Sequence, residues 1–324
     1  MFGWSESAWI SMFAGVALKS TVVFVAAGPV TILLHKCSAA ARHLVWLAAA
    51  VAVLLLPLLS VSLPPIHVPM GRIPAIFDAG VTNHSTAIGF AGANTPGTRV
   101  AAEEKAQIAQ PTRGLPDWRQ WLIFLWIIGS LLGSAQMLVA CASIRRVRRS
   151  SQPFGNRDLC RTLAQSLGIR REVRVLETGR GTMPMTFGLL RPTVYIPSLE
   201  GWSEGLRRVV LLHELAHVAR NDSATHLLAR AALNLYWWNP LAWMAWRGFL
   251  KERERAADNL VLGTGEHAPD YASNLLEIAR TIRPPSISGL AATTMGRRSQ
   301  MEGRLLAILD SGINRKTPGR TASW

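Results

Sequence analysis

The stretch His213-Glu214-Leu215-Ala216-His217 lies in an apolar run, after Val209-Val210-Leu211-Leu212 and before Val218-Ala219. On a helix, residues four apart share a face, so both imidazoles can reach one ion. Zinc binds imidazole nitrogens, and in a catalytic site it takes three protein ligands and leaves one position for water. Glu214 can then take a proton from that water. The stretch predicts a zinc helix from about Glu204 to beyond His217.

The third ligand distinguishes a zinc site from a helix that merely carries two histidines. A metzincin pattern needs a histidine six residues after His217, where this chain has Ser223. Glutamate-ligated zinc peptidases take a Glu from a later helix instead. Glu254 and Asp258 are four apart, so we predict that Glu254 binds zinc while Asp258 orients a ligand histidine. Glu252 points elsewhere on this helix and is predicted to be a solvated charge.

Two polar residues follow the second histidine closely, and for each of them the sequence leaves alternative roles open. Asp222, five residues past His217, either supports a ligand histidine or merely closes the helix. His226 lies nine residues past His217, which is poor spacing for a ligand. It stays open as a hydrogen-bond donor to the transition state.

Several ordered motifs together resemble a known family, the BlaR/MecR-type antirepressor metallopeptidases of peptidase family 56, over roughly residues 10–310. The motifs are Ala41-Arg42-His43-Leu44-Val45-Trp46, residues 184–197, His213-Glu214-Leu215-Ala216-His217, Arg220-Asn221-Asp222, Trp237-Trp238-Asn239-Pro240-Leu241-Ala242-Trp243 and Glu254-Arg255-Ala256-Ala257-Asp258. The family usually has Cys just before the final Asp, where this chain has Ala257. That Cys is not a zinc ligand in the glutamate-ligated scheme, so the ligand prediction stands. The resemblance implies a gluzincin-like domain and a signalling role.

Composition and charge favour a membrane protein. The 324 residues are 49% hydrophobic with a formal net charge of +15, and their mean hydropathy is +0.19. A chain both apolar and basic predicts apolar spans in lipid with basic ends on one side. The basic residues are scattered at span ends rather than gathered on one aromatic-studded surface, so no direct nucleic-acid partner is predicted. The three cysteines make no disulfide framework and fit a reducing compartment.

The apolar segments predict three transmembrane helices, at about Ala8–Leu34, Leu44–Leu63 and Trp121–Ala142. Four arginines follow the third span, at positions 145, 146, 148 and 149, and mark that end as cytoplasmic. The predicted organisation is two spans in 1–63, an extracytoplasmic loop in 64–117, a third span in 118–144, a cytoplasmic peptidase domain in 145–310 and a basic, disordered tail in 311–324. The N-terminus is then outside the bacterial cytoplasmic membrane. Lys19, inside the first span, is functional, packed or snorkelling.

The segment between the arginines and the zinc helix is predicted to be a small α/β unit. It comprises a helix over 157–167, strands over 173–176 and 193–196, and a segment at 185–190 that is either a substrate-aligning edge strand or a core strand. Residues 227–249 are rich in Trp and are divided by Asn239-Pro240. They predict either a membrane-embedded hairpin or two helices at the interface.

These predictions combine into a multi-pass α-helical membrane protein with a cytoplasmic α+β gluzincin-like zinc metallopeptidase domain. Its expected partners are membrane lipid and a protein substrate, which the resemblance suggests is a cytoplasmic transcriptional repressor or the chain itself; a homo-oligomer stays open. Alternatives are a membrane scaffold or receptor with little turnover, which the intact Glu214 argues against, and a quality-control or CAAX-type protease. No Ser-x-x-Lys followed by Lys-Thr-Gly occurs, so covalent antibiotic binding is not predicted.

Overall fold

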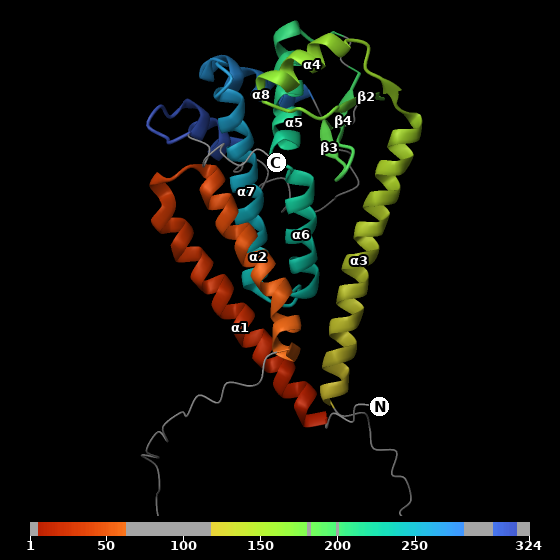
Figure 1. Ribbon diagram of the computed structural model, residues 1–324, viewed down its shortest axis with the longest axis vertical. Coiled ribbons are helices and arrows are strands. Elements are labelled where there is room, and N and C mark those ends of the chain that lie inside the picture. The colour runs from red at the N-terminus through yellow and green to blue at the C-terminus, as the bar shows by residue number, and fades with distance from the viewer. Residues whose placement is uncertain (1–5, 63–117, 180–182, 199–200, 282–300, 316–324) are drawn as a thin grey trace, which may run out of the picture.

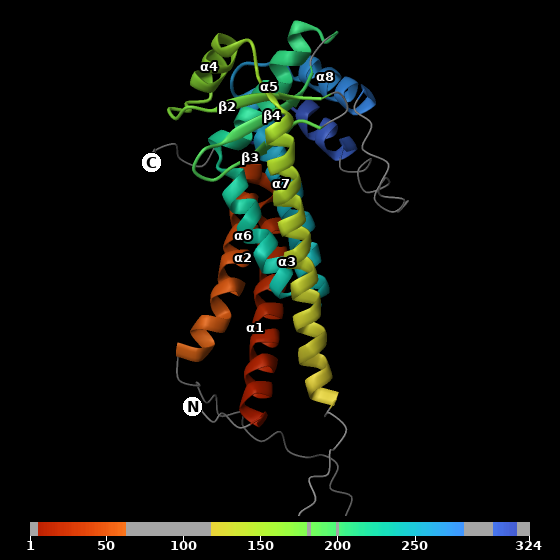
Figure 2. The ribbon, with the colours of Figure 1, turned by 90° about the vertical axis from the view of Figure 1, so that its right-hand side faces the viewer.

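The protein is described by a computed structural model that covers residues 6–62, 118–179, 183–198, 201–281 and 301–315. Its long helices run side by side below a smaller part built of helices and one sheet (Figures 1 and 2). The long helices are α1 (Glu6–Leu33), α2 (Ala39–Ser62), α3 (Trp118–Ser150), α6 (Asp222–Leu235) and α7 (Pro240–Leu262). The shorter helices are η1 (Leu34–Lys36), α4 (Arg157–Ser166), α5 (Glu204–Ala219), α8 (Ala268–Thr281) and an unlabelled helix over 301–309.

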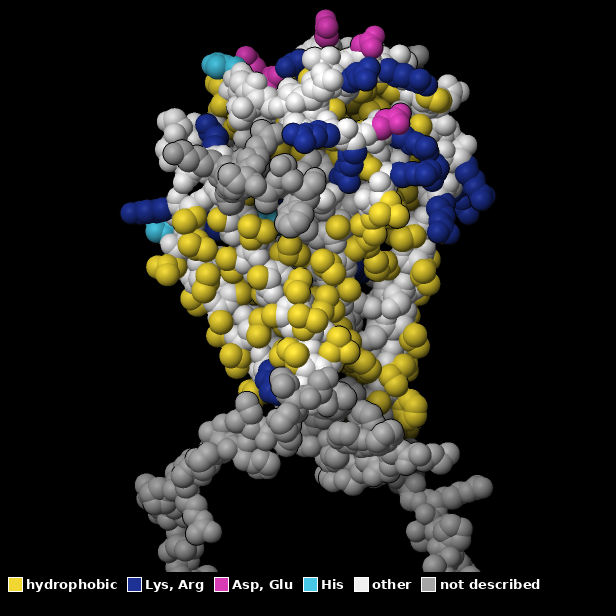
Figure 3. All heavy atoms as spheres, viewed as in Figure 1, with side chains coloured by type: hydrophobic (Ala, Val, Ile, Leu, Met, Phe, Trp, Pro, Cys, Tyr) yellow, Lys and Arg dark blue, Asp and Glu magenta, His cyan; other side chains and the backbone are white. Residues whose placement is uncertain are grey.

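Three of the described helices are long and apolar enough to cross a membrane: Ala14–Lys36, Ala39–Ser60 and Gln120–Ser150. They correspond to the three spans predicted from the sequence. Figure 3 shows hydrophobic side chains over the long helices, with most charged side chains at the opposite end, around α4 and α5. The third helix continues through its arginines to Ser150 instead of ending near Ala142. Lys19 is exposed on α1, so the packed alternative is wrong.

The Trp-rich segment folds as a helical hairpin, α6 and α7, that packs against α1 and α2. Asn239 divides the two helices as predicted: its Oδ1 accepts from the backbone N of Leu241 at 3.0 Å, and Pro240 begins α7. Tyr236 is buried at this turn, and its hydroxyl donates to the Val53 carbonyl of α2 at 2.8 Å. The hairpin therefore shares one hydrophobic core with the first two spans.

Helix α3 approaches the hairpin closely along a short stretch. A Cβ on Gly129 would overlap the Trp237 ring, and one on Gly133 would overlap the Asn234 carboxamide. Asn234 Nδ2 donates to the Ser134 hydroxyl at 2.9 Å. The two glycines, one helical turn apart, thus allow a backbone-to-side-chain contact that any larger residue would prevent.

The four strands form one sheet in the order β1-β2-β4-β3. They are β1 (Gln152–Pro153), β2 (Arg174–Thr178), β3 (Met185–Phe187) and β4 (Thr193–Pro197). Strand β4 is buried along its length and pairs parallel with β2 and antiparallel with β3. It packs on α5 through Val194 and Ile196, in the core that α5 shares with α4 and α8. Among the described residues β3 pairs only with β4 and so lies at an edge of the sheet, as one of the two alternatives requires. That this strand aligns a substrate stays a prediction.

A buried ion pair ties α2 to α7 and corrects one prediction. Glu252 is buried, not solvated, and its Oε2 accepts from Arg42 Nε and NH2, both at 2.8 Å. Arg42 NH1 also donates to the Cys37 carbonyl at 2.6 Å. The sequence prediction was wrong because the partner lies 210 residues away in the chain. The predicted outer loop 64–117 and residues 316–324 of the predicted tail lie outside the described residues.

We expect Arg42→Met to destabilise the fold by about 3–5 kcal/mol, because the buried Glu252 carboxylate would keep only the long 3.5 Å contact from Arg255 NH1. Thermal unfolding of the detergent-solubilised protein measures the loss. Arg247→Met is the matched control, since Arg247 is exposed on α7, the helix that carries Glu252. The double variant Arg42→Met/Glu252→Met should recover much of the stability. Equal melting temperatures for Arg42→Met and Arg247→Met would contradict this account.

Candidate metal centre and active site

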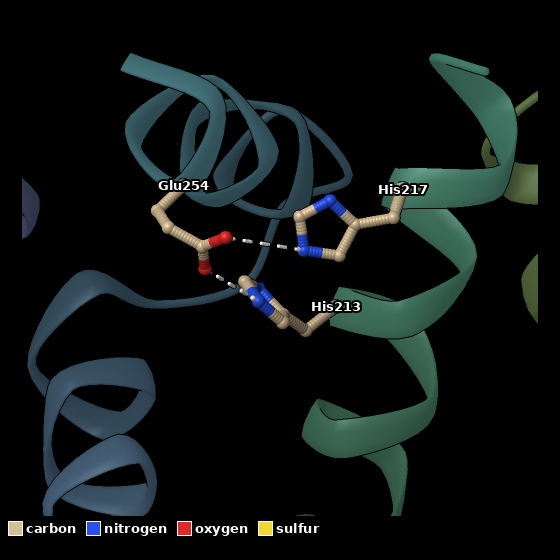
Figure 4. Close-up of side chains that lie close together, drawn as sticks. All are labelled: His213, His217 and Glu254. Atoms are coloured by element: carbon tan, nitrogen blue, oxygen red, sulfur yellow. Dashed lines mark ion pairs between the residues drawn. The ribbon is translucent and has the colours of Figure 1, made fainter. Parts of the chain in front are cut away.

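His213 and His217 lie one turn apart on α5 and face Glu254, which projects from α7 (Figure 4). His213 Nε2 is 3.6 Å from Glu254 Oε2, and His217 Nε2 is 3.9 Å from Glu254 Oε1. One ligand atom from each residue lies within 4.8 Å of the others. Within the described residues, this is a set of three side chains that could hold a metal ion, and it is the set predicted from the sequence.

The other ring nitrogen of each histidine is already engaged. His217 Nδ1 is 2.7 Å from Asp222 Oδ2. His213 Nδ1 is 3.0 Å from the Tyr271 hydroxyl and 3.4 Å from Asp258 Oδ1. With Nδ1 bonded to an outer partner, each ring presents Nε2 to the centre, which is how proteins orient metal-binding histidines. Both predicted supporting residues, Asp222 and Asp258, therefore lie beside a candidate ligand.

A turn between the two helices places Asp222. Asn221 adopts a left-handed backbone conformation, with φ of 55°, and lets the chain reverse directly from α5 into α6. Arg171 donates to the Val218 carbonyl at 2.9 Å and to Asn221 Oδ1 at 2.6 Å, which holds this turn. Arg220 Nε also donates to Asp222 Oδ2 at 3.2 Å. Asp222 consequently begins α6 while its carboxylate points back to His217.

Two residues that the sequence reasoning missed complete the surroundings of Asp258. The Tyr271 hydroxyl of α8 donates to Asp258 Oδ1 at 2.8 Å. Arg304, in the helix over 301–309, donates to both Asp258 oxygens at 2.8 and 2.9 Å. Its NH1 also lies 3.4 Å from Glu254 Oε2. Nothing in their local sequence marks either residue, since the signal is a contact with a helix many residues earlier.

Glu214 is held at the edge of the sheet. The Thr186 hydroxyl of β3 lies 2.8 Å from Glu214 Oε2 and 3.1 Å from the Glu214 carbonyl. Glu214 is itself buried. Thr186, another residue missed from the sequence, thus fixes both the carboxylate and its backbone beside the open edge of β3.

A cleft of about 540 Å³ contains the candidate centre. Its walls come from α3, β3, α5, α6 and α7. The lining residues are Gln136, Met137, Ala140, Cys141, Ile144, Pro184, Met185, Thr186, Phe187, His213, Glu214, His217, Asp222, Ser223, His226, Leu227, Arg230, Trp246, Arg253 and Glu254. Helix α3, the third apolar helix, therefore forms one side of the cleft opposite the zinc-type motif.

The charged side chains around the centre shift one another's pKa. Burial would lower the pKa of His213, but its hydrogen bonds to Asp258 and Glu254 outweigh burial and raise that pKa to about 9. Burial alone would raise the pKa of Asp258, yet the adjacent Arg304 guanidinium and the bond from His213 hold it well below its ordinary value. Without a metal, His213 is thus protonated at neutral pH, and its imidazolium supplies positive charge beside Asp258 and Glu254.

We expect the metal-free protein to lose stability as pH rises toward 9. The folded-state pKa of His213 is raised from an ordinary 6.5 to about 9, so its contribution is full below pH 6.5 and lost as pH passes 9. The span corresponds to about 3 kcal/mol. Unfolding free energies in EDTA at pH 6 and pH 9.5, compared with those of His213→Gln, measure the loss. A parallel pH dependence in parent and variant would refute it.

The chain is similar to a regulatory protein and to methicillin resistance proteins. Regulatory protein BlaR1 of Bacillus licheniformis is 27% identical over 144 residues, which cover 43% of this chain and 24% of that protein. The methicillin resistance mecR1 proteins of Staphylococcus aureus and Staphylococcus epidermidis are each 24% identical over 200 residues, 59% of this chain and 34% of theirs. The matches thus span a quarter to a third of the length of these curated relatives.

The family match is more extensive than any of these pairwise matches. The sequence profile described as BlaR1 peptidase M56 matches residues 11–308, nearly the whole chain and both histidines, Glu214 and Glu254. The resemblance read from the motifs is therefore confirmed. The chain belongs to the BlaR1 peptidase M56 family.

Proposed function

We propose that the protein is an integral-membrane zinc endopeptidase with a gluzincin-like site on the cytoplasmic side. His213, His217 and Glu254 would hold the ion, with Asp222, Asp258 and Tyr271 orienting the histidines. The observation that carries the proposal is the convergence of two Nε2 atoms on the Glu254 carboxylate while both Nδ1 atoms are bonded outward. Two imidazoles and one carboxylate are a donor set that suits zinc and leaves a coordination position for water.

Glu214 is the proposed proton carrier. Bound zinc would acidify water and polarise the peptide carbonyl. Glu214 takes a proton from the attacking water, the water oxygen bonds to the carbonyl carbon, and the C=O π electrons move to oxygen. When the C–N bond breaks, Glu214 passes its proton to the leaving amine nitrogen. The hydrogen bond from Thr186 to Oε2 keeps the carboxylate pointed at the cleft throughout.

The open edge of β3 is the proposed substrate platform. Residues 184–187 line the cleft, and β3 has β4 on one side only. An extended peptide can therefore add to this edge by backbone hydrogen bonds, which would carry its scissile bond past Glu214. Met185, Leu227 and Trp246 offer apolar contacts for its side chains in the same cleft.

The regulatory part of the proposal rests on the family and on the packing of the site against the spans. The substrate would be a cytoplasmic transcriptional repressor or the chain itself, and an outside stimulus would act through the membrane helices. Helix α7 carries Glu254 and is tied to α2 through Arg42 and Glu252, so a shift of the spans can change the site. We propose that residues 229–250 of the α6–α7 hairpin lie in the membrane, because they share a core with α1 and α2, while Asp222 and Glu254 near the ends of the hairpin stay on the cytoplasmic side.

The first prediction concerns metal and cleavage together. We expect about one zinc per chain in the detergent-purified protein, by atomic emission, and cleavage of itself or of fluorescein-labelled casein. Glu254→Gln should lose the zinc because it removes a ligand. Glu214→Ala should keep the zinc and lose cleavage at least a hundredfold, because only the proton carrier is gone. Glu266→Gln, on an exposed ion pair with Arg208, is the matched control.

Each outcome separates the proposed peptidase from its alternatives. Zinc retained in Glu254→Gln would show that the third ligand was wrongly chosen. A parent protein that binds zinc and cleaves nothing would favour a receptor or scaffold. No zinc at any loading would exclude the enzyme. Cleavage of unrelated proteins at equal rates would favour a quality-control protease over a repressor-specific one.

A second prediction concerns Arg304. We expect Arg304→Ala to lower zinc affinity about 10- to 100-fold, because Asp258 would lose its cation and no longer hold Tyr271 and His213 in place. Competition with a fluorescent chelator measures the affinity. Arg208→Ala is the control, as Arg208 is exposed on the same helix as both histidines and pairs with the partly buried Glu266 instead of with a residue of the metal centre. Unchanged affinity in Arg304→Ala would show that its contacts serve packing alone.

A further inference from the structure

His226 is a cleft residue whose place the metal centre does not explain. It lies on the first turns of α6 and lines the cleft together with both candidate ligand histidines. Its ring packs edge-to-face against Trp246 of α7, with ring centroids 5.0 Å apart. Its Nδ1 lies 2.8 Å from Arg253 NH1. The ring is therefore held on one edge by a cation and on one side by an indole.

The contact with Arg253 decides which nitrogen of His226 carries the proton. A guanidinium has only donors, so His226 Nδ1 must be the acceptor. A neutral imidazole that accepts at Nδ1 carries its hydrogen on Nε2. Within the described residues, Nε2 has no hydrogen-bond partner and is not among the fully buried polar atoms. It is thus a fixed N–H donor at the wall of the cleft.

Arg253 also joins this donor to the metal centre. Its NH2 and Nε lie 2.8 and 3.1 Å from Glu254 Oε1. The planar guanidinium of Arg253 thus contacts both Glu254, the candidate third ligand, and His226. Arg253 therefore links the His226 imidazole to the metal centre. His226 faces the cleft from α6, whereas Glu214 faces it from α5. Both residues line the cleft that contains the three candidate ligands, so a peptide that fills the cleft contacts both.

We propose that His226, with its tautomer set by Arg253, donates a hydrogen bond from Nε2 to the substrate carbonyl oxygen as negative charge develops there. The inference rests on the proposed peptidase function and names a further catalytic residue for it. Arg253 is a positioning residue that acts through His226. A donor fixed before the reaction stabilises the tetrahedral intermediate more than the planar substrate, so the donor serves the rate rather than binding.

The test compares His226→Ala with the zinc-loaded parent protein on fluorescein-labelled casein. We expect kcat to fall about 100-fold or more, with KM and zinc content unchanged, because the lost bond forms only in the transition state. His226→Gln should recover much of the loss, since its carboxamide can accept from Arg253 and donate to the substrate. His267→Asn, an exposed histidine before α8, is the matched control.

Two further measurements separate donation from packing. Binding of a phosphoramidate peptide, which carries a tetrahedral anion, should weaken in His226→Ala at full zinc occupancy, whereas a substrate-like peptide should bind as before. Arg253→Met should lower kcat in the parent background and add little in the His226→Ala background, because Arg253 acts through the ring. Independent, multiplying losses would overturn the positioning role.

The results distinguish this proposal from the peptidase proposal. Full zinc with unchanged kcat in His226→Ala overturns the donor and leaves the peptidase intact. Equal losses in His226→Ala and His226→Gln show that ring packing, not donation, is at work. If His226→Ala fails to bind zinc, the kinetic and phosphoramidate measurements are made on zinc-loaded His226→Phe, which keeps a ring but has no N–H donor, and unchanged kcat and phosphoramidate affinity in that variant overturn the donor. A zinc-loaded parent that cleaves neither itself nor casein refutes the peptidase itself, and the donor with it.

Discussion

Three acidic residues on one helix, two of them buried and one partly buried, set the constraint on which the site depends. Glu252, Glu254 and Asp258 lie within two turns of α7, and Glu252 and Asp258 are almost fully buried. A carboxylate removed from water needs a cation or several hydrogen bonds, or the fold loses several kcal/mol. Each has partners in another part of the structure. Glu252 pairs with Arg42 of α2, Glu254 faces the histidines of α5, and Asp258 pairs with Arg304 of the helix over 301–309.

These ion pairs fix α7 to one segment that precedes it in the sequence and to another that follows it. Arg42 lies 210 residues before its partner, and Arg304 lies 46 residues after its own. The membrane helices and the final described helix thus meet on the element that carries Glu254. The cations that compensate the acidic residues of α7 also determine where the Glu254 carboxylate lies relative to His213 and His217. Stability and site geometry therefore share one set of contacts.

Local periodicity predicted much of this fold. The apolar run around His213 predicted α5, Asn239-Pro240 predicted the break between α6 and α7, and the four-residue spacing of Glu254 and Asp258 placed both at the centre. The failures concern contacts between distant segments. Glu252 was taken for a solvated charge because Arg42 is far away in sequence, and Thr186, Tyr271 and Arg304 have no local pattern that would distinguish them from ordinary surface or core residues.

The glycines of α3 have a mechanical consequence. Because Gly129 and Gly133 leave room only for Trp237 and Asn234, a slide of α3 by one turn, about 5.4 Å, would bring Leu125 or Met137 against the hairpin. The contact therefore fixes the position of α3 along its own axis, and any tilt of the helix has this contact as its fulcrum. Below it lies the end that adjoins residues 63–117, and above it lie Met137 to Ile144 at the cleft. A tilt of α3 would therefore move the cleft wall in the direction opposite to the Trp118 end of the helix.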